Sequence, residues 1–174
     1  MGRWNIRWSI LLVLWCVTGV KLAAMKVESL DRGWFFNRGY ESQAADKVTV
    51  DLPHTWNAAD AMFGNVNYYR GMSTYSRFIV VPSSENFKRV FLRVKAAQTV
   101  ADVYLDNHFV AQHKGGYTSF TVELTHLIRR GEKQKLDIRV SNAQTMEIAP
   151  ICGDFNIWGG LNRGVELLYT DDAC

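Results

Sequence analysis

The chain has 174 residues, of which 48% are hydrophobic and 13% aromatic, and its formal net charge is +3. Residues 1–25 hold three of the 20 lysines and arginines and none of the 17 acidic residues, so the remainder carries equal numbers of both charges. Sequence-independent nucleic-acid binding requires excess positive charge that neutralises phosphates. The sequence therefore predicts one globular domain of about 150 residues that does not bind nucleic acid.

The first 25 residues have the pattern of a signal peptide. Arg3 and Arg7 form a basic region, an apolar run covers Ser9 to Val20, and Ala23 with Ala24 supplies small residues for cleavage. The run has 12 residues, which is below the roughly 18 expected of a membrane-spanning helix. An uncleaved anchor is the alternative. We expect export to the periplasm or the extracellular space, with no membrane association beyond the signal peptide.

Short β-branched and aromatic segments with a period of two follow along the rest of the chain. Asp106 and Asn107 separate two of them as a two-residue hairpin loop would. Strands at this spacing predict an all-β antiparallel sandwich or jelly roll rather than βαβ units. The predicted strands are residues 47–52, 74–81, 89–94, 101–105, 117–124, 135–140 and 165–169.

Two long segments, residues 53–71 and 150–164, do not have the pattern of strands. Both are rich in Gly, Asn and aromatic residues. Loops of more than roughly 12–15 residues are usually functional or disordered, and disorder fits poorly because aromatic side chains tend to pack. We therefore look for functional residues in these two segments.

Common catalytic and metal-binding motifs do not occur in the sequence. It has no Gly-rich phosphate loop, zinc-protease pair or nucleophile elbow. The four histidines, at positions 54, 108, 113 and 126, lack metal-ligand spacing, so we expect them to form structural hydrogen bonds. No cofactor and no metal are predicted. Export would permit Cys152 and Cys174 to pair, and two unpaired thiols are at least as consistent with the sequence.

Several ordered blocks of residues resemble the N-terminal sugar-binding domain of glycoside hydrolase family 2, of the β-galactosidase type. The resemblance covers roughly residues 30–170. It implies a galactose-binding-domain-like jelly roll, an antiparallel β-sandwich over residues 26–174. The blocks are LPHTWN at 52–57, NYYRG at 67–71, Tyr75 with Arg77 and Phe78, AxVYL at 101–105, HxGGYTxF at 113–120, GDF at 153–155 and GGxxRxV at 159–165.

The resemblance also implies where catalysis takes place. Family 2 enzymes use two glutamates on a (β/α)₈ barrel in a retaining mechanism, and such a barrel takes about 250 residues. We therefore expect a fragment that lacks the following immunoglobulin-like and barrel domains, with the barrel as its partner. By itself the chain is not expected to hydrolyse a substrate. The alternatives are a free-standing carbohydrate-binding module and a protein-interaction module.

The resemblance suggests three substrate-binding residues and no catalytic ones. Asp154 matches a position whose carboxylate accepts hydrogen bonds from sugar hydroxyls, and a carboxylate can accept from two hydroxyls at once. The alternative is that Asp154 caps a turn in a Gly-rich loop. A second contact is an asparagine in the 53–71 segment, for which Asn57 and Asn67 are both candidates. The expected ligand is a β-galactoside-like carbohydrate.

Other residues of the two long segments are expected to be structural. Arg70 and Arg163 fit the resemblance as scaffold arginines, and Trp56 is expected to pack. Asn162 departs from the resemblance, because relatives usually carry an aromatic residue there. We expect this change to weaken the packing of its loop.

Overall fold

A computed structural model describes residues 25–39, 48–59, 68–84, 86–148 and 156–171. These residues form twelve β-strands. The first six are β1 Met25–Ser29, β2 Trp34–Arg38, β3 Val48–Val50, β4 His54–Thr55, β5 Met72–Val80 and β6 Arg89–Val94. The others are β7 Val100–Leu105, β8 His108–Lys114, β9 Phe120–Glu123, β10 Lys133–Ser141, β11 Gly160–Leu161 and β12 Val165–Thr170.

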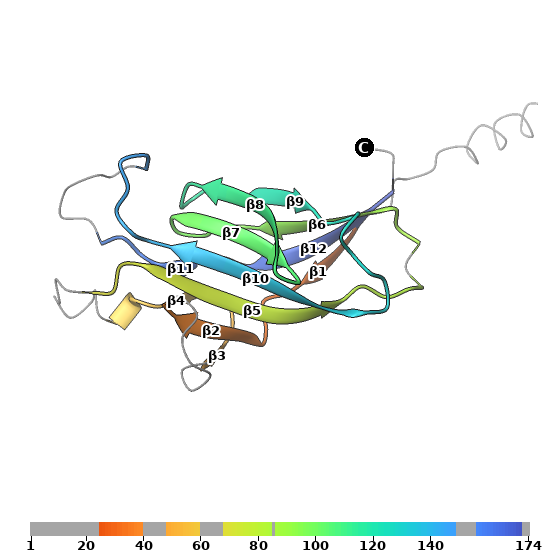
Figure 1. The fold of residues 1–174 in the computed structure, drawn as a ribbon, viewed down its shortest axis with the longest axis horizontal. Helices are drawn as coiled ribbons and strands as arrows, with labels where there is room; N and C mark the ends of the chain where they lie inside the picture. Colours follow the sequence, from red (N-terminus) through yellow and green to blue (C-terminus); the bar gives the residue numbers. More distant parts are fainter. Residues whose placement is uncertain (1–24, 40–47, 60–67, 85, 149–155, 172–174) are drawn as a thin grey trace, which may run out of the picture.

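Two antiparallel sheets form a jelly-roll β-sandwich, as the sequence predicts. One sheet has the order β3-β2-β5-β10-β7-β8, and the other has the order β1-β12-β6-β9. The two sheets lie one behind the other in Figure 1. The short strands β4 and β11 pair with each other in a third, two-stranded sheet. The fold is therefore all-β, with every strand pair in it antiparallel.

The alternating sequence pattern places one face of each strand in the core. Buried and partly exposed residues alternate along β6 and β7, as expected when successive side chains point to opposite faces of a sheet. Leu92, Leu136 and Leu167, from three different strands, have no exposed surface. The apolar residues facing inward from both sheets therefore form one core.

The hairpin between β7 and β8 confirms a local prediction. Asp106 and Asn107 have φ angles of 48° and 67°, the left-handed conformation that a two-residue hairpin loop requires and that Asp and Asn tolerate. The Asp106 carboxylate also accepts a hydrogen bond from the backbone N–H of Lys135 at 2.8 Å. The turn is therefore fixed to the neighbouring strand β10.

Several boundaries differ from the prediction. The expected strand 117–124 covers only Phe120–Glu123 in the structure. Strands β1 and β2 were not predicted. Met25, expected to end the signal peptide, begins β1 and lies opposite Thr170. Residues 1–24, together with Cys152 and Cys174, lie outside the described residues.

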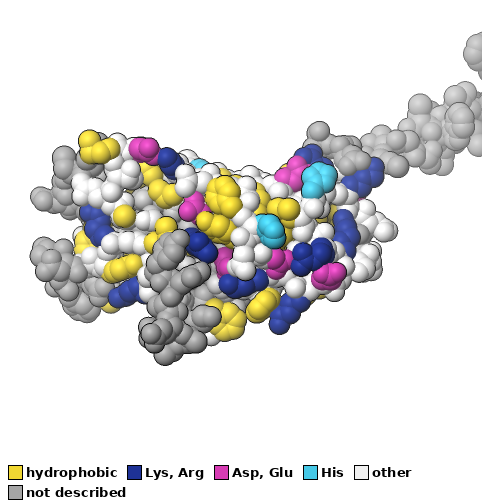
Figure 2. All heavy atoms as spheres, in the orientation of Figure 1, with side chains coloured by type: hydrophobic (Ala, Val, Ile, Leu, Met, Phe, Trp, Pro, Cys, Tyr) yellow, Lys and Arg dark blue, Asp and Glu magenta, His cyan; other side chains and the backbone are white. Residues whose placement is uncertain are grey.

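The outer surface carries a mixture of side-chain types. Figure 2 shows hydrophobic, basic and acidic side chains interspersed over the face seen in Figure 1. Some exposed rings on this domain are covered by cations: Lys133 lies 4.2 Å from the centroid of Phe78, and Arg139 lies 4.2 Å from that of Tyr104. Such pairs shield apolar rings from water. A broad surface of one charge sign, of the kind that attracts nucleic acid, is not seen on this face.

Replacing a core leucine tests the assignment of the core. We expect Leu136→Ala to lower the free energy of unfolding by about 2–5 kcal/mol, because Leu136 is fully buried and its loss leaves a cavity. The matched control is Leu127→Ala, at a position 40% exposed, which should cost less than about 1 kcal/mol. Urea denaturation followed by circular dichroism measures both. Equal losses would contradict the assigned core.

Candidate functional site

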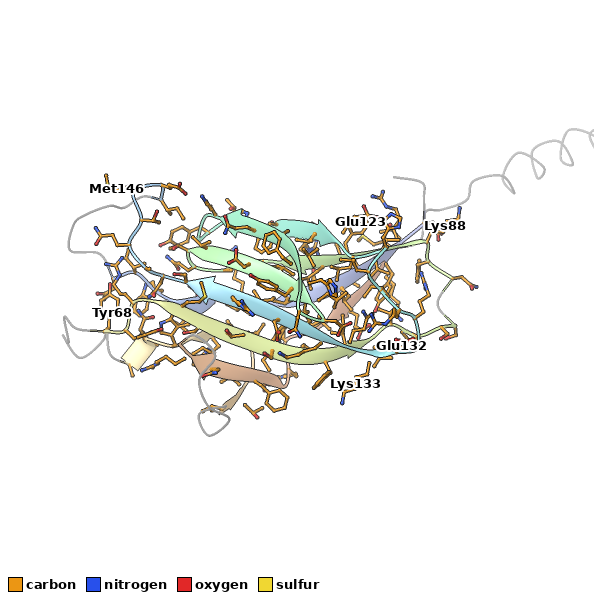
Figure 3. The ribbon with its side chains drawn as sticks, viewed as in Figure 1. Tyr68, Lys88, Glu123, Glu132, Lys133 and Met146 are labelled. Carbon is orange, nitrogen blue, oxygen red and sulfur yellow. The ribbon has the colours of Figure 1, made fainter. Side chains whose placement is uncertain are left out.

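The two long segments singled out in the sequence meet at one end of the sandwich. Strand β4 of the first pairs with β11 of the second, with Gly160 opposite Thr55. The backbone N–H of Trp56 also donates to the carbonyl of Gly159 at 3.0 Å. We call residues 54–57 and 157–162 the loop junction. Figure 3 shows Tyr68 and Met146 at this end and Lys88 and Glu132 toward the other.

Two glycines allow the close approach at the loop junction. A Cβ atom on Gly159 would lie 2.1 Å from the ring of Trp56. Gly160 has a φ of +138°, and a Cβ there would lie 2.3 Å from the carbonyl oxygen of His54. A side chain at either position would force backbone or ring to move. The Gly-Gly block therefore has a packing role in this domain.

Asn57, one of the predicted sugar contacts, holds the loop junction together. Its Nδ2 donates to the carbonyl of Ile157 at 2.9 Å, and its Oδ1 accepts from the N–H of Gly159 at 2.9 Å. The residue has no exposed surface. Its amide is therefore engaged by the protein's own backbone, which gives Asn57 a structural role in this domain, and its contact with a sugar stays a prediction. Asp154 and Asn67 lie outside the described residues, so their sugar-binding roles stay predictions.

A second buried amide, which the sequence reasoning missed, adds a third segment to this end. The Oδ1 of Asn142 accepts from the N–H of Gly71 at 2.9 Å, and its Nδ2 donates to the carbonyl of Ile157 at 3.0 Å. The hydroxyl of Tyr68 accepts from the N–H of Ile157 at 2.9 Å. The available signal was an Asn directly after the long alternating strand β10. We call Asn57 and Asn142 the amide clamp.

Removing one member of the amide clamp should destabilise the domain. Asn57→Ala leaves the N–H of Gly159 without its partner and removes one of two amide donors to the carbonyl of Ile157, and we expect a loss of about 1–3 kcal/mol in the free energy of unfolding. The control is Asn86→Ala, at an exposed position, with an expected change within about 0.5 kcal/mol. Urea denaturation measures both. A loss for Asn57→Ala as small as that of the control would refute the clamp.

His54 connects the loop junction to the core of the sandwich. Its Nδ1 lies 2.7 Å from the hydroxyl of Tyr75, a fully buried residue of β5. Burial, followed by the nearby positive charge of Arg38, lowers the pKa of His54 below its usual value. Burial raises the pKa of Tyr75 well above its usual value. Both groups are therefore neutral near pH 7, which suits a hydrogen bond inside an apolar cluster.

The lowered pKa of His54 predicts a pH dependence of stability. Because the unfolded chain binds this proton more readily, the stabilisation is complete above the unfolded pKa of about 6.5 and is lost as the pH falls through the lower folded pKa. We expect wild type to lose more stability between pH 7.5 and 5 than His54→Gln does. Urea denaturation at several pH values measures the difference. Parallel profiles for the two proteins would rule out His54 as the cause.

Other predicted residues have mixed outcomes. Trp56 is buried, as expected of a packing residue. Arg70 donates from Nε to the carbonyl of Asn142 at 3.4 Å, in keeping with a scaffold role, whereas Arg163 is exposed and its scaffold role stays a prediction. Asn162 forms hydrogen bonds: its Nδ2 donates to Gln98 at 2.7 Å, and its Oδ1 accepts from Thr55 at 3.2 Å. These bonds hold the loop in place, whereas we expected Asn162 to weaken the packing of that loop.

The described part of this end has a shallow surface. A hollow of about 10 Å³ has room for about one water molecule and is lined by Arg70, Thr99, Ala143, Gln144, Thr145, Ile148 and Ile157. Within the described ranges, no cluster of three or more His, Cys, Asp or Glu side chains could hold a metal ion. The described ranges also contain no helix long and apolar enough to cross a membrane.

The chain belongs to glycoside hydrolase family 2: the family model "Glycosyl hydrolases family 2, sugar binding domain" matches residues 30–171. The family resemblance seen in the sequence is thereby confirmed, while its β-galactosidase type is not.

Similar proteins include enzymes of two specificities. A β-glucuronidase of Bacteroides fragilis is 39% identical over 145 residues, covering 83% of this chain and 21% of that protein. A β-galactosidase of Thermoanaerobacter pseudethanolicus is 31% identical over 127 residues, covering 71% of this chain and 17% of that protein. A crystal structure of Bacteroides uniformis β-glucuronidase superposes with a TM-score of 0.77 at 29% identity, covering 86% and 18% of the two chains. The chain thus spans about a fifth of the length of these relatives.

Proposed function

We propose that this chain is the sugar-binding domain of a longer family 2 enzyme that hydrolyses a terminal β-linked sugar. The match to the family's sugar-binding domain over residues 30–171 is the observation that carries the proposal. In the retaining mechanism of such glycosidases, two carboxyl groups about 5–5.5 Å apart flank the glycosidic bond. These groups belong to the barrel of the complete enzyme, and this domain contributes part of the rim around the substrate.

A β-glucuronide is the substrate that we favour. Relatives at 39% and 37% identity bear the names β-glucuronidase and putative β-glucuronidase. The β-galactoside inferred from the sequence is the second candidate, which a β-galactosidase relative at 31% identity supports. The two sugars differ in the carboxylate of glucuronate and in the orientation of one hydroxyl, so one domain scaffold is compatible with either.

Within this enzyme, Asp154 is proposed to accept hydrogen bonds from hydroxyls of the terminal sugar. The segment that includes Asp154 leads directly into Ile157, which both members of the amide clamp hold by its carbonyl. A carboxylate at a solvated rim can accept from two hydroxyls at little cost in the empty site. We further propose that residues 1–25 direct the enzyme out of the cytoplasm.

Hydrolysis of two chromogenic substrates tests the proposal. The complete product of the gene that encodes these residues should cleave 4-nitrophenyl β-D-glucuronide with a kcat/KM at least about 100-fold above that for the β-D-galactoside, because the substrate carboxylate is recognised by buried polar groups. The 174-residue chain by itself should cleave neither. A preference for the galactoside would select the second candidate, and a complete product that cleaves neither would refute the proposal.

A variant of the complete product tests Asp154 in the same assay. Asp154→Ala should raise KM by about tenfold or more, which corresponds to the loss of a charge-assisted hydrogen bond. The matched control is Asp102→Ala on β7, whose carboxylate accepts from Gln112 at 2.8 Å within the sheet. Its kinetics should equal those of wild type. Unchanged kinetics in both variants would favour a turn-capping role for Asp154.

A further inference from the structure

Tyr117 is an exposed aromatic residue held in place by a buried amide. Its relative exposure is 70%, the highest among the aromatic residues of the described ranges. Nevertheless its hydroxyl accepts a hydrogen bond from Nε2 of Gln98 at 2.9 Å. An exposed tyrosine ordinarily hydrogen-bonds to water, so this fixed orientation calls for an explanation.

Gln98 connects Tyr117 to the loop junction. The side chain of Gln98 belongs to a residue only 2% exposed, and its Oε1 accepts from Nδ2 of Asn162 at 2.7 Å. Asn162 in turn accepts from the hydroxyl of Thr55 at 3.2 Å. Three hydrogen bonds therefore lead from β4 through Asn162 and Gln98 to the ring of Tyr117. A buried amide with both ends engaged specifies a single geometry.

The segment around Tyr117 is also fixed by its backbone. The N–H of Gly115 donates to the carbonyl of Thr99 at 2.8 Å. Gly115 has a φ of +137°, and a Cβ on Gly116 would lie 2.9 Å from Cγ of Gln98. The segment therefore lies against Gln98 at a distance that only glycine permits, and the ring of Tyr117 is positioned before any ligand arrives.

The exposed ring offers two complementary groups to a ligand. No cation and no other ring packs on Tyr117 among the described residues, in contrast to Phe78 and Tyr104, which carry Lys133 and Arg139. Because the phenol oxygen accepts from Gln98, its own proton is available to donate. The side chain of Tyr117 thus presents a rigid apolar ring face next to a hydrogen-bond donor. A pyranose ring matches it, with C–H groups on one face and oxygen atoms around its edge.

We propose that Tyr117 is a stacking platform for a sugar of a β-linked saccharide chain, with Gln98 and Asn162 as its positioning residues. The platform binds a sugar other than the terminal one that the complete enzyme cleaves. The inference depends on the proposed function only for the chemical class of ligand. Its test is therefore binding by the 174-residue chain, which requires no hydrolysis.

Nuclear magnetic resonance titration of the 174-residue chain tests the platform. The probes are cellotetraose, which is neutral, and a hyaluronan tetrasaccharide, which contains β-linked glucuronate. We expect millimolar binding of at least one probe, with the largest shift changes at Tyr117 and Gln98. Tyr117→Ala should weaken binding at least about tenfold, as expected on truncation of an anchoring aromatic. Tyr117→Ala also leaves Nε2 of the buried Gln98 without its partner, so its thermal unfolding is compared with that of Tyr117→Phe, which loses the same bond.

Two further variants separate the ring from its hydroxyl and from exposed rings in general. Tyr117→Phe keeps the stacking face and loses the bond to Gln98, so binding should weaken only about threefold. Phe109→Ala removes another exposed ring, 58% exposed on β8, and should bind as wild type does. The proposal is overturned if neither probe binds, or if Tyr117→Ala binds as tightly as wild type. A loss in Tyr117→Phe as large as in Tyr117→Ala would also overturn it, because the ring is retained.

Discussion

The hydrogen bonds of two buried asparagine amides determine how the loops of this domain are arranged. A long loop that lies against a protein surface must find partners for its backbone N–H and C=O groups. Asn57 and Asn142 both donate to the carbonyl of Ile157, one from the first long segment and one from the end of β10. Three segments far apart in the sequence thereby share one fixed point.

The sandwich supplies the rigid base for this arrangement. Asn142 directly follows β10, which pairs with β5 on one side and β7 on the other, and Gln98 lies just before β7. Tyr75 of β5 reaches from the core to His54 at the loop junction. Loop geometry and core packing are therefore parts of one cooperative structure. Damage to the core is expected to reach the loops, because the clamping residues are attached to central strands.

The surface at the loop end is compatible with a sugar site that this domain forms together with the rest of a larger enzyme. Among the described residues, the hollow lined by Arg70, Thr99 and Ile157 holds about one water molecule. In the proposed function, this domain contributes contacts from one side and the remainder of the polypeptide closes the site. The relatives, of which this chain spans about a fifth, have the additional length that such a site requires. The shared sugar-binding domain is common to enzymes named for two different sugars.

The sequence by itself determined the all-β class, the strand at residues 89–94 and the hairpin at Asp106-Asn107. These features depend on local alternation and turn chemistry, which neighbouring residues decide. Only the tertiary structure decided that β4 pairs with β11, that Asn57 is buried, and that Asn142 and Gln98 hold the loops. Each of these contacts joins residues far apart in the chain, with 100 positions between Asn57 and Ile157. A local sequence pattern does not reveal such partners, because a buried amide and a ligand-binding amide have the same side chain.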